Sequence, residues 1–461
     1  MLQKLKNLFS QVDMTEGTIW KKIVAFSIPM ILGNVAQQLY NTVDSIVVGR
    51  YVGDNALAAV GSAGPIVNLL LVMFIGISMG ASIMVSQYFG SRDRENLSKT
   101  IGSAITLTAA ACIFMIIVCA PLIRPVLEIL NTPESIIDWC TSYLLIMLFG
   151  GVGVAYYNIL TGVLRGLGDS LSALIYLLVA TVINIVLDIW FVAGLDMGVS
   201  GVALATVIAQ LVSAIMCFIK LRKMSGMFDM GLRYLKPDMS NIKMMVKLGL
   251  PSGITQAIFS MAMIVVQSLT NSFGEMVIAA NVIIMRVDGF AMMPNFSYGT
   301  AMTTFAGQNV GAGKMDRVRK GAKQGTWIAV GTSAAITGVI LIFGKYLMGI
   351  FTSTTELVQL SSNMMRILAI GYIAMAVTQS LSGVMRGAGD TMTPMWISMI
   401  TTIIIRIPLA YGLAFLTRTA ERPTGHYVSI WISLLTAWLL GALITFICYK
   451  KGKWESKVIK K

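Results

Sequence analysis

Long apolar segments separated by short polar ones run through the whole chain, and none shows the two-residue alternation of membrane β-strands. Each segment is long enough to cross a bilayer as a helix, which takes about 20 residues. Twelve can be distinguished, at 19–48, 56–86, 100–123, 136–163, 172–194, 200–221, 244–272, 277–307, 322–344, 357–384, 394–416 and 426–449. The pattern predicts an all-α integral membrane protein with twelve transmembrane helices.

Composition supports this fold class. Of the 461 residues, 56% are hydrophobic and 12% charged, with a mean hydropathy of +0.77. Soluble domains carry about 25% charged residues. Most of this chain is therefore expected to lie within the membrane, in contact with lipids.

The two halves of the chain resemble each other when one is shifted by 221 residues, the separation of Thr161 and Ser382. The segments 161–170 and 382–391 share six of ten residues, including the pattern Arg-Gly-x-Gly-Asp. Gln87 and Gly90 align with Gln308 and Gly311 at the same shift, and Pro29 lies one position from alignment with Pro251. Three matches in the same order indicate an internal repeat.

The repeat predicts a lobe from each copy, with lobes at 1–221 and 244–461 and a linker at 222–243. Six spans is an even number, so both copies enter the membrane in the same direction. Two six-helix lobes related by a pseudo-two-fold axis along the membrane normal are therefore expected.

Basic residues lie mainly on one side of the predicted membrane. Of the 35 Lys and Arg, 27 fall on the side of the N-terminus, 5 on the other side and 3 (Arg286, Arg366 and Arg406) within spans. Positively charged loops remain in the cytoplasm, so both termini are predicted to face the cytoplasm of a prokaryotic inner membrane. The net charge of +14 is thereby explained without nucleic acid as a partner.

Three acids fall inside the predicted spans: Asp44, Asp188 and Asp288. Charged groups are costly in a membrane and mark functional sites by default. Asp44 and Asp188 lie at similar depths in the first lobe, towards the outer side, as does Thr206. Asn184 lies one helical turn from Asp188.

Polar residues continue the Asp44 face along the first span. Asn34, Gln37, Asn41 and Asp44 follow three- and four-residue spacing, and Tyr40 lies one turn from Asp44. Such a face is expected to meet a neighbouring helix or water. Hydrogen bonding that only holds the helices together is the alternative, mainly for Asn34 and Asn41.

The third acid, Asp288, is expected to act in structure or gating. Arg286 and Asp288 are two residues apart, so they point to different helix faces and pair with other helices. Arg366 or Arg406 is the expected partner of Asp288. An ion-coupling role for Asp288 is the alternative.

Together, the repeat, the Asp44 face, the Asn184–Asp188 pair and the two Arg-Gly-x-Gly-Asp loops resemble the multidrug and toxic compound extrusion (MATE) transporters, especially the DinF-like and archaeal branch. The resemblance covers essentially the whole chain. It implies the MATE fold and a cation or proton site at Asp44, Asn184, Asp188 and Thr206. It also implies that Gln37, Tyr40 and Asn158 face the same cavity, which Asn34 extends.

The expected function is secondary active efflux of lipophilic, cationic organic compounds in exchange for H⁺ or Na⁺. The predicted transporter is monomeric and needs no cofactor or nucleic acid. A lipid-linked oligosaccharide flippase of the same superfamily is the alternative, although an acidic pocket argues against it. An enzyme is not expected, since the single histidine, His426, lies near a loop and no nucleophile–base pair is visible. Nucleotide binding is not expected either. Residues 307–314 resemble a phosphate-binding loop, but the first glycine is one place off and Met315 stands where Ser or Thr is needed. Neither Arg-Gly-x-Gly-Asp loop follows a strand, as a dinucleotide-binding loop would.

Overall fold

The computed structural model describes residues 12–130, 132–224, 226–420 and 422–457. Within them, eleven helices are long and apolar enough to cross a membrane. A twelfth span is supplied by two helices, Thr355–Ala369 and Gly371–Gly387, which meet at a bend of 42°. The all-helical prediction of twelve spans is thus confirmed, with the tenth span broken at Ile370.

Residue contacts divide the chain into two compact units. Unit 1 contains Ile28–Gly253 with Val12 and Asp13, and unit 2 contains Met14–Ser27 with Ile254 onward. The long helices α2 (Ile19–Tyr51) and α9 (Met239–Asn271) each begin in one unit and end in the other. Both changes of unit lie within two residues of a proline, Pro29 or Pro251.

This division departs from the sequence-based lobes at 1–221 and 244–461. The first nine residues of α2 belong to unit 2, and α9 up to Gly253 belongs to unit 1. Hydrogen bonds explain the first departure, because Gln308 Oε1 accepts from Met14 N at 2.9 Å and Asn309 Nδ2 donates to Met14 O at 3.1 Å. The boundaries of the sequence repeat and of the compact units therefore differ, because each copy of the repeat contributes a helical segment to the other unit.

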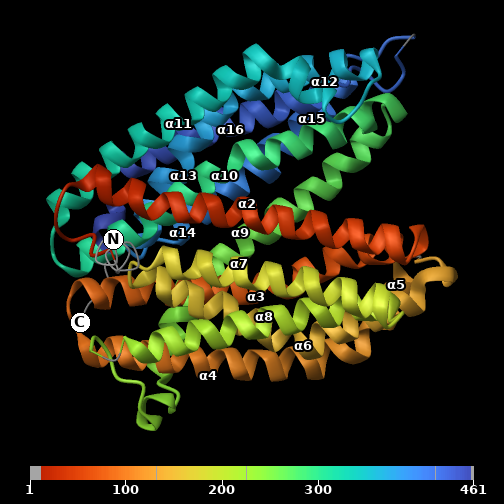
Figure 1. Ribbon diagram of the computed structural model, residues 1–461. Helices are drawn as coiled ribbons and strands as arrows, with labels where there is room; N and C mark the ends of the chain where they lie inside the picture. Colours follow the sequence, from red (N-terminus) through yellow and green to blue (C-terminus); the bar gives the residue numbers. More distant parts are fainter. Residues whose placement is uncertain (1–11, 131, 225, 421, 458–461) are drawn as a thin grey trace, which may run out of the picture. The chain divides into compact units, whose positions relative to one another are not determined.

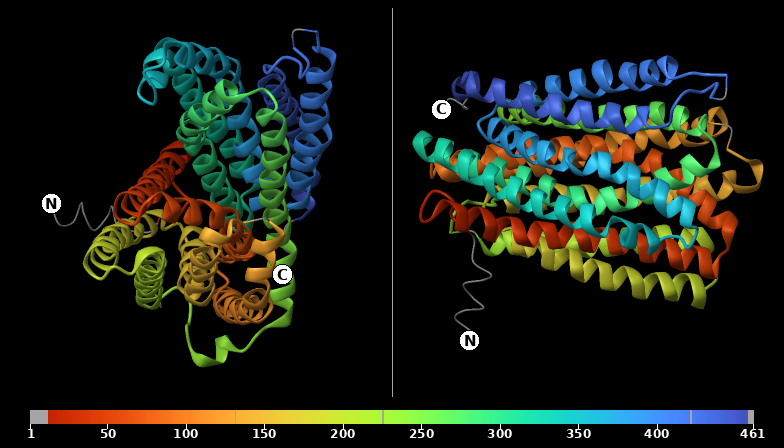
Figure 2. Two further views of the ribbon diagram at one scale, coloured as in Figure 1. Left: turned by 90° about the vertical axis from the view of Figure 1, so that its right-hand side faces the viewer. Right: turned by 90° about the horizontal axis from the view of Figure 1, so that it is seen from above.

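Unit 1 consists mainly of long helices packed side by side, with α6 contacting α3, α4, α7 and α8. They are drawn in orange to yellow-green in Figure 1, and Figure 2 shows several of them nearly end-on. The predicted span at 100–123 proves longer, because α4, η1 and α5 follow one another over Arg94–Ile129. Its elements are α3 (Asp54–Gly90), α4 (Arg94–Cys119), η1 (Ala120–Leu122), α5 (Ile123–Ile129), α6 (Glu134–Gly166), α7 (Ser170–Asp188), η2 (Ile189–Gly194), α8 (Gly198–Lys223) and η3 (Leu232–Leu235).

Unit 2 repeats this plan around α13, which contacts α10, α11 and α16. Its core contains Trp431 and Tyr372, both almost without exposed surface. Its elements are α10 (Glu275–Gly311), α11 (Met315–Gly349), α12 (Thr355–Ala369), α13 (Gly371–Gly387), α14 (Met392–Met399), η4 (Ile400–Arg406), α15 (Ile407–Leu416), α16 (Ser429–Lys450) and η5 (Lys453–Lys457).

Glycine packing repeats between the units at the 221-residue shift. In unit 1, a Cβ atom on Gly162 or Gly166 of α6 would overlap atoms of α3 at Ser78 or Ser82. In unit 2, a Cβ on Gly383 or Gly387 of α13 would overlap backbone oxygens of α10 at the corresponding positions 299 and 303. Small residues let membrane helices approach closely, so the repeated motif sets the same helix contact in each copy.

The Arg-Gly-x-Gly-Asp loops form the turns that the sequence predicts. Gly168 and Gly389 have φ of 89° and 103°, a left-handed conformation that favours glycine. The carboxylate of Asp169 accepts from Ser172 N at 2.9 Å, and that of Asp390 accepts from Thr393 N at 3.2 Å. Asp169 thus caps α7, and Asp390, one residue before the N-cap of α14, accepts from the first turn of that helix.

Candidate functional site

The intramembrane acids of unit 1 lie together. Asp44 comes from α2 and Asp188 from the end of α7, and their carboxylates are close enough to interact directly. Thr206 of α8 accepts a hydrogen bond from Tyr40 Oη at 3.1 Å and one from Asn184 Nδ2 at 3.5 Å. The four residues predicted to form a proton or cation site are therefore neighbours in one unit. We call Tyr40, Asp44, Asn184, Asp188 and Thr206 the acid cluster.

The acid cluster holds oxygens that lack a hydrogen-bond donor. Among the described residues, no donor reaches Asp44 Oδ1, Asn184 Oδ1 or either carboxylate oxygen of Asp188, and all four atoms are buried. Asp188 and Asn184 have no exposed surface. Two buried carboxylates without a cationic partner are unfavourable unless a proton or a cation neutralises them. The arrangement therefore suits the binding of either one.

A break in helix geometry follows Asp188. The residues Ile189–Gly194 form the π-helical segment η2, in which Leu195 N donates to Trp190 O at 3.0 Å, five residues back. Single π-helical turns occur frequently at functional sites and are points where a helix register changes. The acid cluster thus adjoins a segment of α7 and η2 that is not a regular α-helix.

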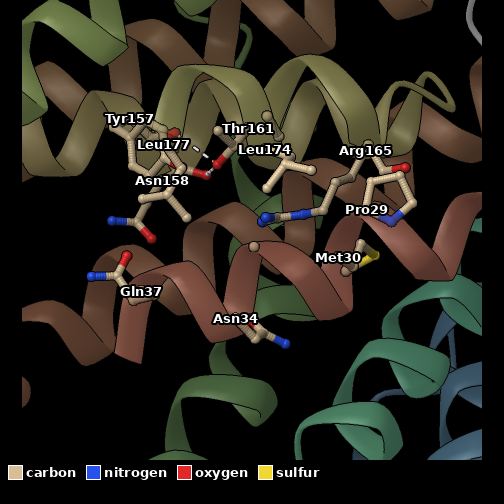
Figure 3. Close-up of a pocket in the computed structure, with 13 residues that line it drawn as sticks. Pro29, Met30, Asn34, Gln37, Tyr157, Asn158, Thr161, Arg165, Leu174 and Leu177 are labelled. Carbon is tan, nitrogen blue, oxygen red and sulfur yellow. Dashed lines mark hydrogen bonds between the residues drawn. The ribbon is translucent and has the colours of Figure 1, made fainter. Parts of the chain in front are cut away.

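Other predicted residues lie in a separate pocket of about 210 Å³ in unit 1. Its lining includes Asn34, Gln37, Asn158 and Arg165, and Figure 3 shows Gln37 and Asn158 pointing toward one another from α2 and α6. Arg165 lies nearer Pro29, which precedes Asp44 by fifteen residues, or roughly 22 Å along a helix.

Tyr40, which was expected to face the same cavity as Gln37, does not line this pocket. The hydroxyl of Tyr40 is held by Thr206, so Tyr40 belongs to the acid cluster. Asn34 and Asn41 are exposed within unit 1, and Gln37 Nε2 donates to Asn41 Oδ1 at 3.5 Å. The polar face of α2 thus contributes residues to both the pocket and the acid cluster.

Two residues near these places were not predicted. Tyr143 of α6 is buried close enough to Asp44 and Asp188 to feel their charges. Arg165, from the first Arg-Gly-x-Gly-Asp loop, lines the pocket. The repeat of this loop was the signal available for Arg165, whereas a single tyrosine in α6 gave none.

In unit 2, Asp288 of α10 accepts a hydrogen bond from Tyr372 Oη at 2.9 Å and interacts electrostatically with Arg406. Arg366 is exposed on α12, as is Arg286 on α10. Of the two expected partners of Asp288, the structure therefore places Arg406 near it.

Within the described ranges, no group of three or more His, Cys, Asp or Glu side chains is placed to hold a metal ion. The acid cluster has two carboxylates with neutral oxygens from Asn184 and Thr206, a donor set that a hard cation such as Na⁺ prefers.

Comparison with known proteins agrees with this architecture. The family model MatE matches residues 29–190 and 251–412, once in each half of the chain. The chain is 28% identical over 452 residues to the probable multidrug resistance protein YoeA of Bacillus subtilis, covering 96% of each protein. It is 24% identical to the probable multidrug resistance protein NorM of Thermotoga maritima, over 98% of this chain and 97% of that one.

A solved structure has the same fold. An outward-facing multidrug resistance MATE family transporter superimposes with a TM-score of 0.88 at 23% identity, covering 96% of this chain and 98% of that one. The two family matches fall one in each copy of the internal repeat, and each includes the repeated glycine contacts. The chain belongs to the MatE family of membrane transporters, the multidrug and toxic compound extrusion proteins.

Proposed function

We propose that this transporter exports lipophilic organic cations in exchange for H⁺ or Na⁺, and that the acid cluster couples the two movements. The observation that carries the proposal is the set of buried, donor-less oxygens on Asp44, Asn184 and Asp188 in one unit. Relatives named multidrug resistance proteins support export of varied organic compounds.

The mechanism follows from the charge of the cluster. When both carboxylates are charged, they repel each other and attract a cation. Binding of H⁺ or Na⁺ removes part of this charge and stabilises the conformation in which the oxygens are close together. An ion shifts the conformational equilibrium only by its differential affinity for two states, so the cluster must open or close between the inward- and outward-facing forms.

Helix α2 is suited to transmit such a change. It contains Pro29, which lacks an N–H group and weakens the helix at that point. It also carries Gln37 on the pocket and Asp44 in the acid cluster. Bending of α2 near Pro29 would therefore alter both places together.

The test is export of a lipophilic cationic dye from proteoliposomes under an imposed H⁺ or Na⁺ gradient. We expect Asp44→Asn and Asp188→Asn to lower gradient-driven export at least tenfold, because each removes a charge that binds the ion (1.4 kcal/mol corresponds to about tenfold). Asp138→Asn is the matched control, since Asp138 is an exposed acid paired with Arg124. Wild-type export by both cluster variants under both gradients would refute the proposal.

The orientation of the chain is also part of the proposal. The excess of Lys and Arg on the side of the N-terminus favours cytoplasmic termini in a prokaryotic inner membrane. A C-terminal fusion to green fluorescent protein should fluoresce and a fusion to alkaline phosphatase should be inactive. The opposite pair of results would reverse the orientation.

A further inference from the structure

Unit 2 encloses a cavity of about 400 Å³, within the usual range for small-molecule sites. Its walls are mainly apolar, with aromatic and methionine side chains such as Phe259, Met375, Trp431 and Trp438, and they also include the amides of Gln256, Gln267 and Asn281. Asp288 and Arg406 lie together in the lining. The cavity is larger than the pocket of unit 1 and contains none of the residues of the acid cluster.

The guanidinium group of Arg406 interacts electrostatically with Asp288 but has no hydrogen-bond partner among the described residues. Its Nε atom is buried without a hydrogen bond, and no carboxylate of a described residue forms an ion pair with it. A buried positive charge without a hydrogen-bonded partner is costly. Arg406 therefore has an unsatisfied capacity to bind an anion, and guanidinium groups bind carboxylates with two parallel hydrogen bonds.

Local helix geometry places Arg406 at this wall. It is the last residue of the π-helical segment η4, and Pro408 follows two residues later. Proline has no N–H to donate to the carbonyl four residues back, and its ring crowds that carbonyl. Proline is one of the recognised causes of a local break in helical register.

Asp288 is the acid that interacts electrostatically with Arg406. One of its carboxylate oxygens already accepts a hydrogen bond from Tyr372. Tyr372 Oη donates to Asp288 Oδ1 at 2.9 Å, and the Tyr372 ring lies 5.8 Å from that of Trp438. Asp288 thus reduces the positive potential around Arg406 without occupying its hydrogen-bonding edge. The hydrogen-bonding edge of Arg406 is therefore left without an acceptor among the described residues.

We propose that this cavity binds an amphipathic organic anion, with the anionic group on Arg406 and an aromatic or aliphatic body against Trp431, Trp438 and Phe259. The site is independent of the acid cluster and has the opposite charge preference. The chain then contains a cation-binding place in unit 1 and an organic-anion site in unit 2.

Calorimetric titration of the purified full-length protein in nanodiscs tests this directly. The probes are 1-naphthoate, the neutral 1-naphthamide and the cationic 1-naphthylmethylammonium, which share one ring system. We expect naphthoate to bind most tightly. Arg406→Gln should weaken naphthoate binding at least tenfold and leave naphthamide binding within twofold, while Arg366→Gln, which alters an exposed arginine of the same unit, changes neither.

The sign of the Asp288 effect discriminates between ligand charges. Asp288→Asn removes a negative charge but keeps an oxygen that accepts from Tyr372, so naphthoate should bind more tightly. Weaker naphthoate binding with unchanged ammonium binding in this variant, or equal naphthoate binding by Arg406→Gln and wild type, would overturn the proposal.

A second variant, which fills the cavity and leaves Arg406 unchanged, tests the proposal even if Arg406→Gln does not fold. A Cβ atom on Gly289, in the lining, would meet no atom within 4 Å, and the same is true of Gly331 on α11, outside the lining. Gly289→Leu should abolish binding of naphthoate, whereas Gly331→Leu should not. Binding retained by Gly289→Leu would place the ligand elsewhere.

The anionic group bound by Arg406 could belong to a lipid headgroup or to a free organic anion. Titration in phosphatidylcholine nanodiscs and in nanodiscs containing phosphatidylglycerol distinguishes them. Equal naphthoate affinity in both identifies a free solute as the occupant, and competition by phosphatidylglycerol identifies an anionic lipid; either result supports an anion site. Asp44→Asn should not change these affinities, so this result is independent of the proposed coupling.

Discussion

At the scale of single residues, the hydroxyl of Thr206 joins two parts of the acid cluster. It accepts from Tyr40 and Asn184, which occupies both lone pairs of the hydroxyl oxygen, so a bound cation would replace the longer bond from Asn184. Thr206→Val keeps the shape of the side chain but removes these interactions. We expect a several-fold lower rate of ion-driven dye export, measured in proteoliposomes, and near wild-type export by Thr206→Ser. Loss of export in Thr206→Ser with near wild-type export in Thr206→Val would instead indicate a packing role for the methyl group.

An ion pair outside the membrane-spanning segments holds the connection between α8 and α9. Arg94 donates to both oxygens of Asp229, at 2.8 and 3.2 Å, and to Gly226 O at 3.2 Å. Hydrogen bonds from Arg94 hold the pKa of Asp229 below its ordinary value. The resulting stabilisation is present above the pKa of an unfolded Asp, about 3.9, and is lost as the pH falls through the lower pKa of the folded state.

A spin label on Gly226→Cys, in a background without the native cysteines, reports on this connection by electron paramagnetic resonance. We expect constant mobility from pH 7 to pH 5 and a rise below about pH 4, where Asp229 takes up a proton. Arg94→Gln should give the mobile spectrum at every pH. Arg124→Gln, at an exposed ion pair in the same unit, should leave the titration unchanged; an unchanged spectrum in Arg94→Gln would exclude the pair as the restraint.

The sequence was sufficient to group the acidic residues of the first lobe, but not to identify all the residues around them. Asp44, Asn184 and Asp188 could be grouped because charges in a span are costly and helical spacing defines a face. Their ion-coupling role stays a prediction. Tyr143 and Arg165 were missed because an isolated tyrosine and a loop arginine have ordinary structural roles. The unpaired state of Arg406 depends on three-dimensional distances that no spacing rule contains.

At the scale of helices, the glycine contacts give a direct stability prediction. Gly162→Val would push a branched side chain into Ser78 of α3, and overpacking of this kind costs about 1–3 kcal/mol. We expect a lower Tm for detergent-solubilised protein. Gly338→Val is the control, because a Cβ on Gly338 of α11 meets nothing within 4 Å; equal lowering by both variants would attribute the effect to helix propensity alone.

The spans were predictable as elements, but their irregularities were not. Hydrophobic length locates a crossing helix and carries no information on hydrogen-bond register. The π-helical segments η2 and η4 and the 42° bend at Ile370 therefore have no counterpart in the predicted spans. Pro408 was a visible signal for η4, whereas no proline or glycine within Ile189–Ala193 marks the start of η2.

At the scale of the whole molecule, the exchange of helical segments makes each half of the sequence incomplete. Fragments 1–230 and 231–461, produced together, should co-purify, because Met14–Ser27 in the first fragment belongs to unit 2. Arg317→Ala removes hydrogen bonds to Met14 O and Glu16 O and should reduce the recovered complex. Arg319→Ala, which alters an exposed arginine paired with Glu455, is the control. Full recovery with Arg317→Ala would show that this segment does not hold the fragments together.

The same exchange sets an order of events during synthesis. Residues 14–27 leave the ribosome near the beginning, yet their partners Gln308, Asn309 and Arg317 are made only after about 280 further residues have been added. At about 5–20 residues per second, Ile23 and Phe26, fully buried in the finished protein, wait for tens of seconds. During this interval the first helix needs a temporary partner, which makes the start of α2 a natural binding site for the membrane insertion machinery.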